Sequence, residues 1–441
     1  MRRACLLVLL LLILPACQRP PMVLPLMFEA GRVDAFFDTK PSQQTNRQRL
    51  FYVTDRRFDP DCGALGRFTR HRSDGIKLGH LDVAFGPPDA WPRIVAATRA
   101  QSTGRRYNPT INALVRYGDM PWHPAGSPTP QPLTDADDDN APAMLPERLF
   151  IEQLDRAVRD SSGKEITIFV HGYRKGFDNA AYTAAELGLY TAGLGPVVLY
   201  SWPSYNSLYE YSHDRDAVRY TTAHARRFVE FLADEIAGQR LNATRINLVA
   251  HSTGCEVVGS VLRELALMTH GQPPEARRAR WKLGTVLLVA PDISTDVARE
   301  RVLKEDLGGL YEQIVVYTSA RDTALAWASW FLYRAPRLGS LREKDLTAAD
   351  RFWLSKAPNV ALVNVDSQPN LDPIDHSHHR YSAATLSDML LALRSDLPPD
   401  QRGLVREEGQ LIWRFADDYA KRVTDIAATV YRPASGPISN E

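Results

Sequence analysis

Cysteine is scarce in this chain, with 4 residues in 441. Two of them, Cys5 and Cys17, lie at the N-terminus, and the other two, Cys62 and Cys255, are far apart in the sequence. The sequence therefore assigns no disulfide. Cys255 is expected to pack as a small apolar residue at the start of a helix.

The chain also lacks an excess of charge of either sign, because 53 Lys and Arg residues stand against 52 Asp and Glu residues. No block of like charge stands out, so nothing in the sequence indicates binding to nucleic acid or to a membrane through a polybasic surface. No internal repeat occurs at the periods of solenoids or propellers. What remains is an ordinary globular composition with enough apolar residues for a core.

Long hydrophobic runs are missing too, and the nearest to one is Leu6–Leu14 after Arg2 and Arg3. This run is too short to span a bilayer and is typical of an export signal. It ends in "LPAC" at Cys17, which resembles the lipobox of bacterial lipoproteins. We expect residues 1–16 to be a signal peptide and Cys17 to be acylated, with an ordinary cleaved signal as the alternative. Both interpretations predict an exported protein of the bacterial cell envelope, and the first adds a lipid anchor in the outer membrane or on the periplasmic face.

The remaining chain divides by composition. Residues 17–45 are mixed and polar and are expected to form a tether. Residues 46–397 are expected to form one domain, interrupted at 121–147 by an exposed insertion rich in Pro and Asp. Residues 398–441 are expected to form a helical tail that docks on this domain, because "LIWRFADDYAKRV" has a helical period.

Within the domain, short runs of Val, Leu and Ile alternate with longer segments of helical period. Such continuous apolar runs are typical of strands buried on both faces of a parallel sheet. The pattern predicts an α/β fold, a doubly wound and mostly parallel sheet with helices on both faces. The expected strands begin at Ile166, Pro196, Ile246, Gly284, Gln313 and Asn359, and the expected helices are Asp178–Leu194, Asp214–Ala237, Cys255–Met268, Thr323–Tyr333 and Ala383–Arg394.

The sharpest signal is Ala250-His251-Ser252-Thr253-Gly254, directly between an expected strand and an expected helix. It matches the nucleophile elbow G-x-S-x-G with Ala at the first position. Such a turn lifts the Ser252 hydroxyl off the sheet and aims the Thr253 amide at a developing oxyanion. A second oxyanion donor should come from "HGY" after the strand at Ile166: the Tyr173 amide, with Gly172 allowing close backbone approach.

A serine nucleophile needs a histidine base that is held by a carboxylate. The chain order of α/β-hydrolases is serine, acid, histidine. Asp322 fits the acid position, with Asp292 as the alternative. The histidine is left open by position alone, because one loop contains His376, His378 and His379.

The other polar and aromatic residues near the strand ends receive simpler interpretations. His171 and His251 are expected to bond loop backbone, and His378 and His379 to face solvent. The spacing of the histidines matches no zinc motif, so no metal is expected. Trp202 and Tyr205 follow a strand end and are expected to line the substrate pocket.

These motifs resemble a bacterial α/β-hydrolase family of unknown function, from about Phe51 to Arg394. The segments that carry the resemblance are "FYVTDRR", "ITIFVHGYRKGFDNA", "VVLYSWPS", "INLVAHSTG", "VLLVAPDI", "YTSARDTAL" and "DHSHHR". Matching the last segment without gaps places the family histidine on His376. Asp375 stands where the family has Gly, so a second carboxylate lies beside the expected base.

The function that follows is a serine hydrolase acting on carboxylic esters, without metal or cofactor. Its substrate would be a small-molecule or lipid ester, and a lipase or thioesterase is a variant of the same prediction. The alternative is an envelope binding or scaffold lipoprotein on a hydrolase fold that has lost catalysis. Fold does not decide between them, and the sequence predicts no oligomeric state.

Overall fold

The computed structural model describes residues 22–28, 31–100, 107–120, 145–191, 193–205, 211–303, 307–327, 329 and 335–432. The predicted signal peptide of residues 1–16, Cys17 and positions 121–144 of the predicted insertion lie outside these ranges. Among the described helices, none combines the length and apolar content needed to cross a bilayer.

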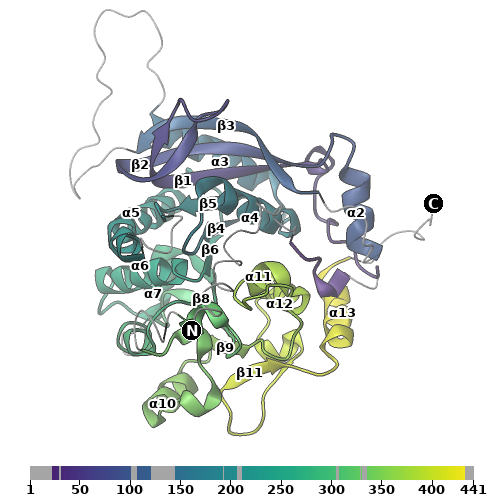
Figure 1. Cartoon of the computed structure of the whole chain (residues 1–441), viewed down its shortest axis with the longest axis vertical. Coiled ribbons are helices and arrows are strands. Elements are labelled where there is room, and N and C mark those ends of the chain that lie inside the picture. Colours follow the sequence, from purple (N-terminus) through teal and green to yellow (C-terminus); the bar gives the residue numbers. More distant parts are fainter. Residues whose placement is uncertain are drawn as a thin grey trace, which may run out of the picture.

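The core of the molecule is one sheet of eleven described strands, in the order β10-β11-β9-β8-β7-β6-β4-β5-β1-β2-β3 (Figure 1). All neighbouring strands are parallel in the central part of the sheet, which runs in the order β11-β9-β8-β7-β6-β4-β5-β1. At one end β2 adds antiparallel to β1 and β3 to β2, and at the other end β10 adds antiparallel to β11. The strands are β1 (Arg47–Asp59), β2 (Arg67–Phe85), β3 (Pro109–Met120), β4 (Glu165–Val170), β5 (Val197–Ser201), β6 (Arg245–His251), β7 (Leu283–Val289), β8 (Tyr311–Thr318), β9 (Val360–Asn364), β10 (Leu404–Val405) and β11 (Ile412–Phe415).

Helices cover both faces of the sheet, as the alternating pattern predicts (Figure 1). Side chains alternate along each strand, so in β4 Phe169 belongs to one core cluster while Ile168 and Val170 belong to the other. The main helices of the first cluster are α2 (Trp91–Ala100), α4 (Phe177–Tyr190), α12 (Ala383–Ser395) and α13 (Tyr419–Val430), and those of the second are α3 (Pro146–Asp160), α5 (Tyr211–Ala237), α6 (Gly254–Met268) and α7 (Pro274–Trp281).

Short helices occupy the connections and chain ends. They are η1 (Leu26–Phe28), η2 (Pro41–Gln43), α8 (Thr295–Ala298), η4 (Arg299–Leu303), α9 (Thr323–Trp327), η6 (Leu338–Ser340), η7 (Glu343–Asp345), α10 (Ala348–Lys356), α11 (His378–Tyr381) and η8 (Pro399–Arg402). The expected fold class is confirmed: a single domain of the α/β type with a mostly parallel sheet between helical layers.

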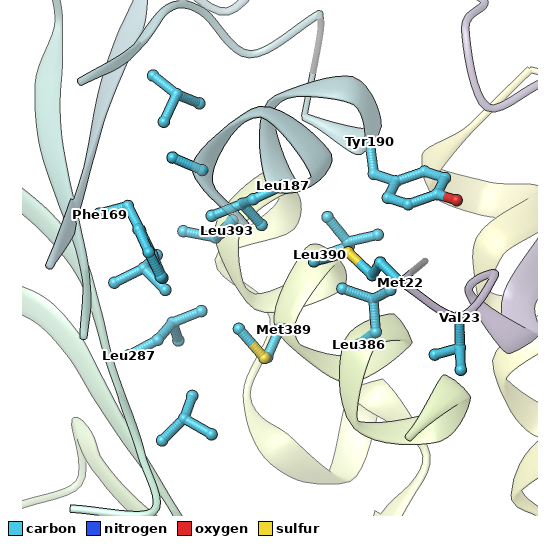
Figure 2. Packing of buried hydrophobic residues seen from close by; sticks show 14 of the residues in the cluster. Met22, Val23, Phe169, Leu187, Tyr190, Leu287, Leu386, Met389, Leu390 and Leu393 are labelled. Carbon is cyan, nitrogen blue, oxygen red and sulfur yellow. The ribbon is translucent and has the colours of Figure 1, made fainter. Parts of the chain in front are cut away.

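The prediction of a tether over residues 17–45 is wrong for its described part. Met22, Val23, Met27 and Phe28 are buried, and Figure 2 shows Met22 and Val23 beside Leu386 of α12. The Val23 amide donates to the Arg380 carbonyl at 2.8 Å, and the Met27 amide to Ser387 Oγ at 3.1 Å. The segment has no helix or strand period, so its burial follows from tertiary contacts that sequence periodicity does not reveal.

The expected boundary at 397 is also wrong, because the last segment completes the domain. β11 pairs in parallel with β9, and β10 pairs with β11, so the sheet continues to residue 415. The helix expected in the tail starts only at Tyr419, because "IWRF" at Ile412–Phe415 is strand β11. α13 contacts both α12 and η1. Apolar alternation over four residues is too short to separate from a helical period.

The buried N-terminal segment gives a stability prediction. Phe28 is 1 % exposed and its ring lies edge-on to Tyr431 at 5.2 Å between centroids. Phe28→Ala should lower the free energy of unfolding by about 3–5 kcal/mol, because it removes a buried aromatic ring and leaves a cavity. Denaturant unfolding measures this, with Leu65→Ala at a 44 % exposed position as the control, expected within about 0.5 kcal/mol of wild type. Equal stability of the two variants would restore the tether interpretation.

Candidate active site

Ser252 occupies a sharp turn between β6, which ends at His251, and α6, which begins at Gly254. Its backbone is left-handed, with φ of 54°, a region that residues other than glycine seldom adopt. The Ser252 amide donates to the Val289 carbonyl at 2.9 Å, and its carbonyl accepts from Cys255 at 3.0 Å and Asp292 at 3.2 Å. These bonds hold the strained turn in place.

Two glycines allow neighbouring backbone to approach this turn. A Cβ at Gly254 would lie 2.5 Å from the His171 carbonyl oxygen and 2.6 Å from that of Val170. A Cβ at Gly172 would lie 2.7 Å from Ser252 Cβ. The loop after β4 therefore lies directly against the turn, which is where an oxyanion hole needs it. Among the described residues the Thr253 amide makes no hydrogen bond, so it is available to an incoming oxygen.

His376 and Asp322 are brought together from distant parts of the chain. His376 Nδ1 lies 2.6 Å from Asp322 Oδ2, and the Asp322 side chain is fully buried. Asp322 Oδ1 accepts the Leu325 amide at 2.9 Å, so the same carboxylate also caps α9. A helix-capping Asp and a histidine-binding Asp look alike in sequence. Asp322 has both roles here: Oδ1 caps the helix and Oδ2 binds the histidine.

The pKa of His376 is shifted by two opposing influences. Burial lowers it, but the charge and hydrogen bond of Asp322, with smaller contributions from Asp292 and Asp372, outweigh burial and raise the pKa above its ordinary value. Since Nδ1 is engaged by Asp322, Nε2 is the nitrogen that can take up a proton.

His251 connects the elbow to the His376 loop. Its Nε2 lies 3.2 Å from the His376 carbonyl oxygen, and the two rings are 4.8 Å apart between centroids. Because a carbonyl only accepts, Nε2 of His251 carries the proton. No hydrogen bond joins the Ser252 hydroxyl to His376 among the described residues. Catalytic hydrogen bonds of this kind often shorten only when substrate binds.

Asp292, the alternative acid, has a different partner. It forms an ion pair with Arg337 at 3.2 Å, and Thr253 Oγ1 donates to it at 3.4 Å. Burial raises the pKa of Asp292, and Arg337 offsets part of that rise. A cavity of about 1050 Å³ opens beside this pair, with Ala320, Ala326 and Arg337 in its lining. The geometry thus pairs His376 with Asp322 rather than with Asp292.

The expectation that His378 and His379 face solvent is wrong, because both are buried. His378 Nδ1 lies 3.1 Å from Asn370 Nδ2, and the ring of His379 lies 4.4 Å from that of His251. Residues 378–381 form the single turn α11, which rotates these two rings inward. Neither side chain has a described contact with Ser252 or Asp322, so neither replaces His376 as the histidine beside the acid.

The prediction that Trp202 lines a substrate pocket is also wrong. Trp202 is 0 % exposed, its Nε1 donates to the His171 carbonyl at 2.7 Å, and its ring stacks on that of His171 at 5.2 Å. Trp202 therefore packs against the loop after β4 from inside the core. Tyr205 is partly exposed and stacks on His213 at 5.3 Å, and its contact with substrate stays a prediction.

Arg56 of β1 is a site residue that the sequence analysis missed. Its buried guanidinium donates Nε to Ser201 Oγ at 2.9 Å and Nη2 to the Lys175 carbonyl at 2.7 Å, and it lies 3.3 Å from His171 Nε2. Burial lowers the pKa of Arg56 to about 10, so it stays charged at neutral pH. Arg56 thereby fixes the loop that carries Gly172. The signal in the sequence was the pair Arg56-Arg57, which closely follows the apolar run Phe51–Val53 in "FYVTDRR".

Among the described residues Cys62 and Cys255 are both free, and Cys255 is buried in the core at the start of α6, as expected. In the described part of the chain, no three His, Cys, Asp or Glu side chains are grouped in a way that could hold a metal ion. The described site brings together Ser252, the His376–Asp322 pair and nearby backbone amides.

The close approach at Gly254 can be tested against a second glycine of the same helix. Gly254→Ala should lower the free energy of unfolding by about 1–3 kcal/mol, because its methyl group meets two carbonyl oxygens. Gly259→Ala has its nearest neighbour at 3.8 Å and should stabilise α6 by up to about 1 kcal/mol. Denaturant unfolding compares them, and equal effects would mean that the loop and the elbow are not in contact.

Several solved structures are similar to this chain at low identity. The apo form of Thermogutta terrifontis esterase 2 is 14% identical, with 53% of this chain and 84% of that chain covered and a TM-score of 0.28. Phospholipase PlaB from Legionella pneumophila is 15% identical, with 48% of this chain and 41% of that chain covered and a TM-score of 0.22. Similarity at this level transfers neither activity nor substrate. No curated protein matches the chain by sequence.

A family model gives a stronger match. Residues 147–394, more than half of the chain, match the family described as "Alpha/beta hydrolase of unknown function (DUF900)". The matched region contains the loop at Gly172, the elbow at Ser252 and the His376 loop, whereas "FYVTDRR" precedes it. The chain therefore belongs to this alpha/beta hydrolase family.

Proposed function

We propose that the protein is a serine hydrolase that acts on carboxylic esters, with Ser252 as nucleophile, His376 as base and Asp322 as the acid that orients it. The observation that carries the proposal is the 2.6 Å contact between His376 Nδ1 and the buried Asp322 carboxylate. The His376 loop is also bonded to His251, the residue directly before the strained Ser252. Serine, acid and histidine also follow the chain order of α/β-hydrolases.

In this mechanism His376 Nε2 accepts the Ser252 proton while Ser252 Oγ attacks the carbonyl carbon of the ester. Negative charge then develops on the carbonyl oxygen, which the Thr253 and Tyr173 amides would stabilise. The imidazolium, stabilised by Asp322, returns the proton to the departing alcohol oxygen, and an acyl-enzyme remains. Water activated by His376 hydrolyses the acyl-enzyme and regenerates Ser252.

A second candidate is a binding or scaffold protein on the same fold. It is favoured by one observation, the absence of a hydrogen bond between Ser252 and His376 among the described residues. A lipase would use the same residues and prefer longer acyl chains, and a thioesterase would release a thiol instead of an alcohol. Turnover of a panel of esters and thioesters of increasing chain length separates these hydrolases from one another and from a binding protein, which would turn over none of them.

Labelling by a fluorophosphonate probe tests the nucleophile. Wild-type protein should be labelled, and Ser252→Ala should lose the label and ester turnover, because the other hydroxyl of the elbow, that of Thr253, donates to Asp292. Ser260→Ala, eight residues further along α6, is the control and should label like wild type. Equal labelling of Ser252→Ala and wild type, with turnover retained, would contradict the proposal.

The pH dependence of kcat/KM tests whether Asp322 is the carboxylate that acts on His376. His376 must be neutral to act as base, so activity should fall as pH decreases, with an apparent pKa above 6.5 because Asp322 raises that of His376. Asp322→Asn should reduce kcat by about 10³–10⁴-fold, because the imidazolium loses its partner, and should shift the acid limb to lower pH.

Asp292→Asn is the matched comparison. It removes the carboxylate charge that pairs with Arg337, so its cost should appear as lower stability, while the acid limb of the folded enzyme shifts much less than in Asp322→Asn. If Asp292→Asn instead produced the large loss of kcat, the acid would be assigned wrongly.

A further inference from the structure

The loop between β9 and α11 presents apolar side chains to solvent beside His376. Leu371 is 70 % exposed and Ile374 is 48 % exposed, and Pro373 between them is also exposed. We call residues Leu371–Ile374 the apolar tip. Single exposed apolar residues are ordinary on protein surfaces, but three within four residues at the edge of a site need a reason.

The apolar tip is held rigidly in this orientation by its own backbone bonds. Asp372 turns inward, where Oδ1 accepts the Ile374 amide at 3.2 Å and Oδ2 accepts the amides of His376 at 3.2 Å and Ser377 at 2.7 Å. The Ile374 carbonyl accepts the Thr323 amide at 3.0 Å. The one charged residue of the tip is thus used internally, and the apolar side chains are left outside.

The N-terminal segment is bonded to the same helical turn as the apolar tip. The Leu371 amide donates to the Tyr381 carbonyl at 3.0 Å, and the Val23 amide donates to the neighbouring Arg380 carbonyl at 2.8 Å. Arg380 also forms a buried pair with Glu186 at 3.0 Å, and Glu186 accepts the Met22 amide at 3.2 Å. Consecutive carbonyls of α11 therefore fix Met22 and the apolar tip close to each other.

This position limits how far an anchored domain can move from a membrane. Five residue steps separate Cys17 from Met22, and an extended chain spans at most about 18 Å over that distance. Figure 2 shows Met22 seated against the helices rather than on a free tether. An acyl chain on Cys17 would therefore hold the face that carries Met22, and with it the apolar tip, at the bilayer surface. Several acyl chains on Cys17 would make a stable anchor, and a second apolar contact would add to the attachment and fix which face of the domain meets the bilayer.

We propose that the apolar tip Leu371–Ile374 contacts the lipid bilayer and places the active site against it, so that the substrate is an ester carried at the membrane surface. The bilayer contact is inferred from the exposure of the apolar tip and from the position of Met22 close to it. The substrate class rests on the proposed function. Insertion depends on apolar area, so contact should persist on neutral lipid.

Vesicle binding tests the contact without using catalysis. All described contacts lie within residues 22–432, so the chain from residue 17 retains them, and Cys17→Ser removes the acylation site. This protein should co-sediment with vesicles of phosphatidylethanolamine and phosphatidylglycerol and with vesicles of phosphatidylcholine. Leu371→Ser with Ile374→Ser should lower the partition coefficient at least tenfold in both.

A matched control lies at the far end of α6. Leu267 and Met268 are 48 % and 46 % exposed, and they lie about 20 Å along the helix from the elbow. Leu267→Ser with Met268→Ser removes similar apolar area and should leave the partition coefficient unchanged. Equal losses in the two double variants, or none in either, would overturn the proposal. A concentration-dependent dimer that only the tip variant disrupts would also overturn it, in favour of a second copy of the chain.

Hydrolysis extends the test to the substrate class. The ratio of turnover on a long-chain ester in vesicles to turnover on a soluble short-chain ester should fall at least tenfold in the tip variant, with an unfolding midpoint like that of wild type. Ser252→Ala should still bind vesicles. Loss of catalysis with retained binding separates failure of the proposed function from failure of the membrane contact, and an unchanged ratio would overturn the substrate class.

Discussion

The left-handed backbone of Ser252 is the constraint around which the rest of the site is arranged. A residue with a Cβ adopts this conformation only when its surroundings compensate the strain. Here β7 and the start of α6 bind its amide and carbonyl, and Gly172 and Gly254 remove the side chains that would collide. The parallel sheet supplies the rigid edge at which these contacts are possible.

Three loops at that edge are fixed by a buried or inward-turned charged group. Arg56 holds the loop after β4, Arg337 is paired with Asp292, and Asp372 binds the backbone of the His376 loop. Burying such charges is costly unless they are paired or hydrogen-bonded. Under the proposed function, loops that are held in place before substrate binds would lower the entropy cost of reaching the reactive geometry.

The N-terminal segment links this edge to the rest of the domain. Met22 and Val23 are bonded to Glu186 of α4 and to Arg380 of α11, and the same turn buries His378 and His379. The segment that leads in from the N-terminus is therefore part of the support of the histidine loop. A mixed, aperiodic stretch can have this role because irregular backbone is satisfied by hydrogen bonds to neighbouring elements.

Local residue patterns determined the sheet and the elbow, because strands buried on both faces must be apolar throughout and a strand-to-helix turn at serine needs small neighbours. Chain order selected Asp322, but it left His376 undecided among three histidines. The tertiary structure decided which carboxylate meets which imidazole, turned His378, His379 and Trp202 inward, and placed Arg56 beneath the loop. It also incorporated residues 22–28, 31–37 and 404–430 into the domain. These outcomes depend on contacts between separate elements of the chain, such as His376 with Asp322, 54 positions apart, and Trp202 with His171, 31 positions apart. Local periodicity carries no signal for such contacts.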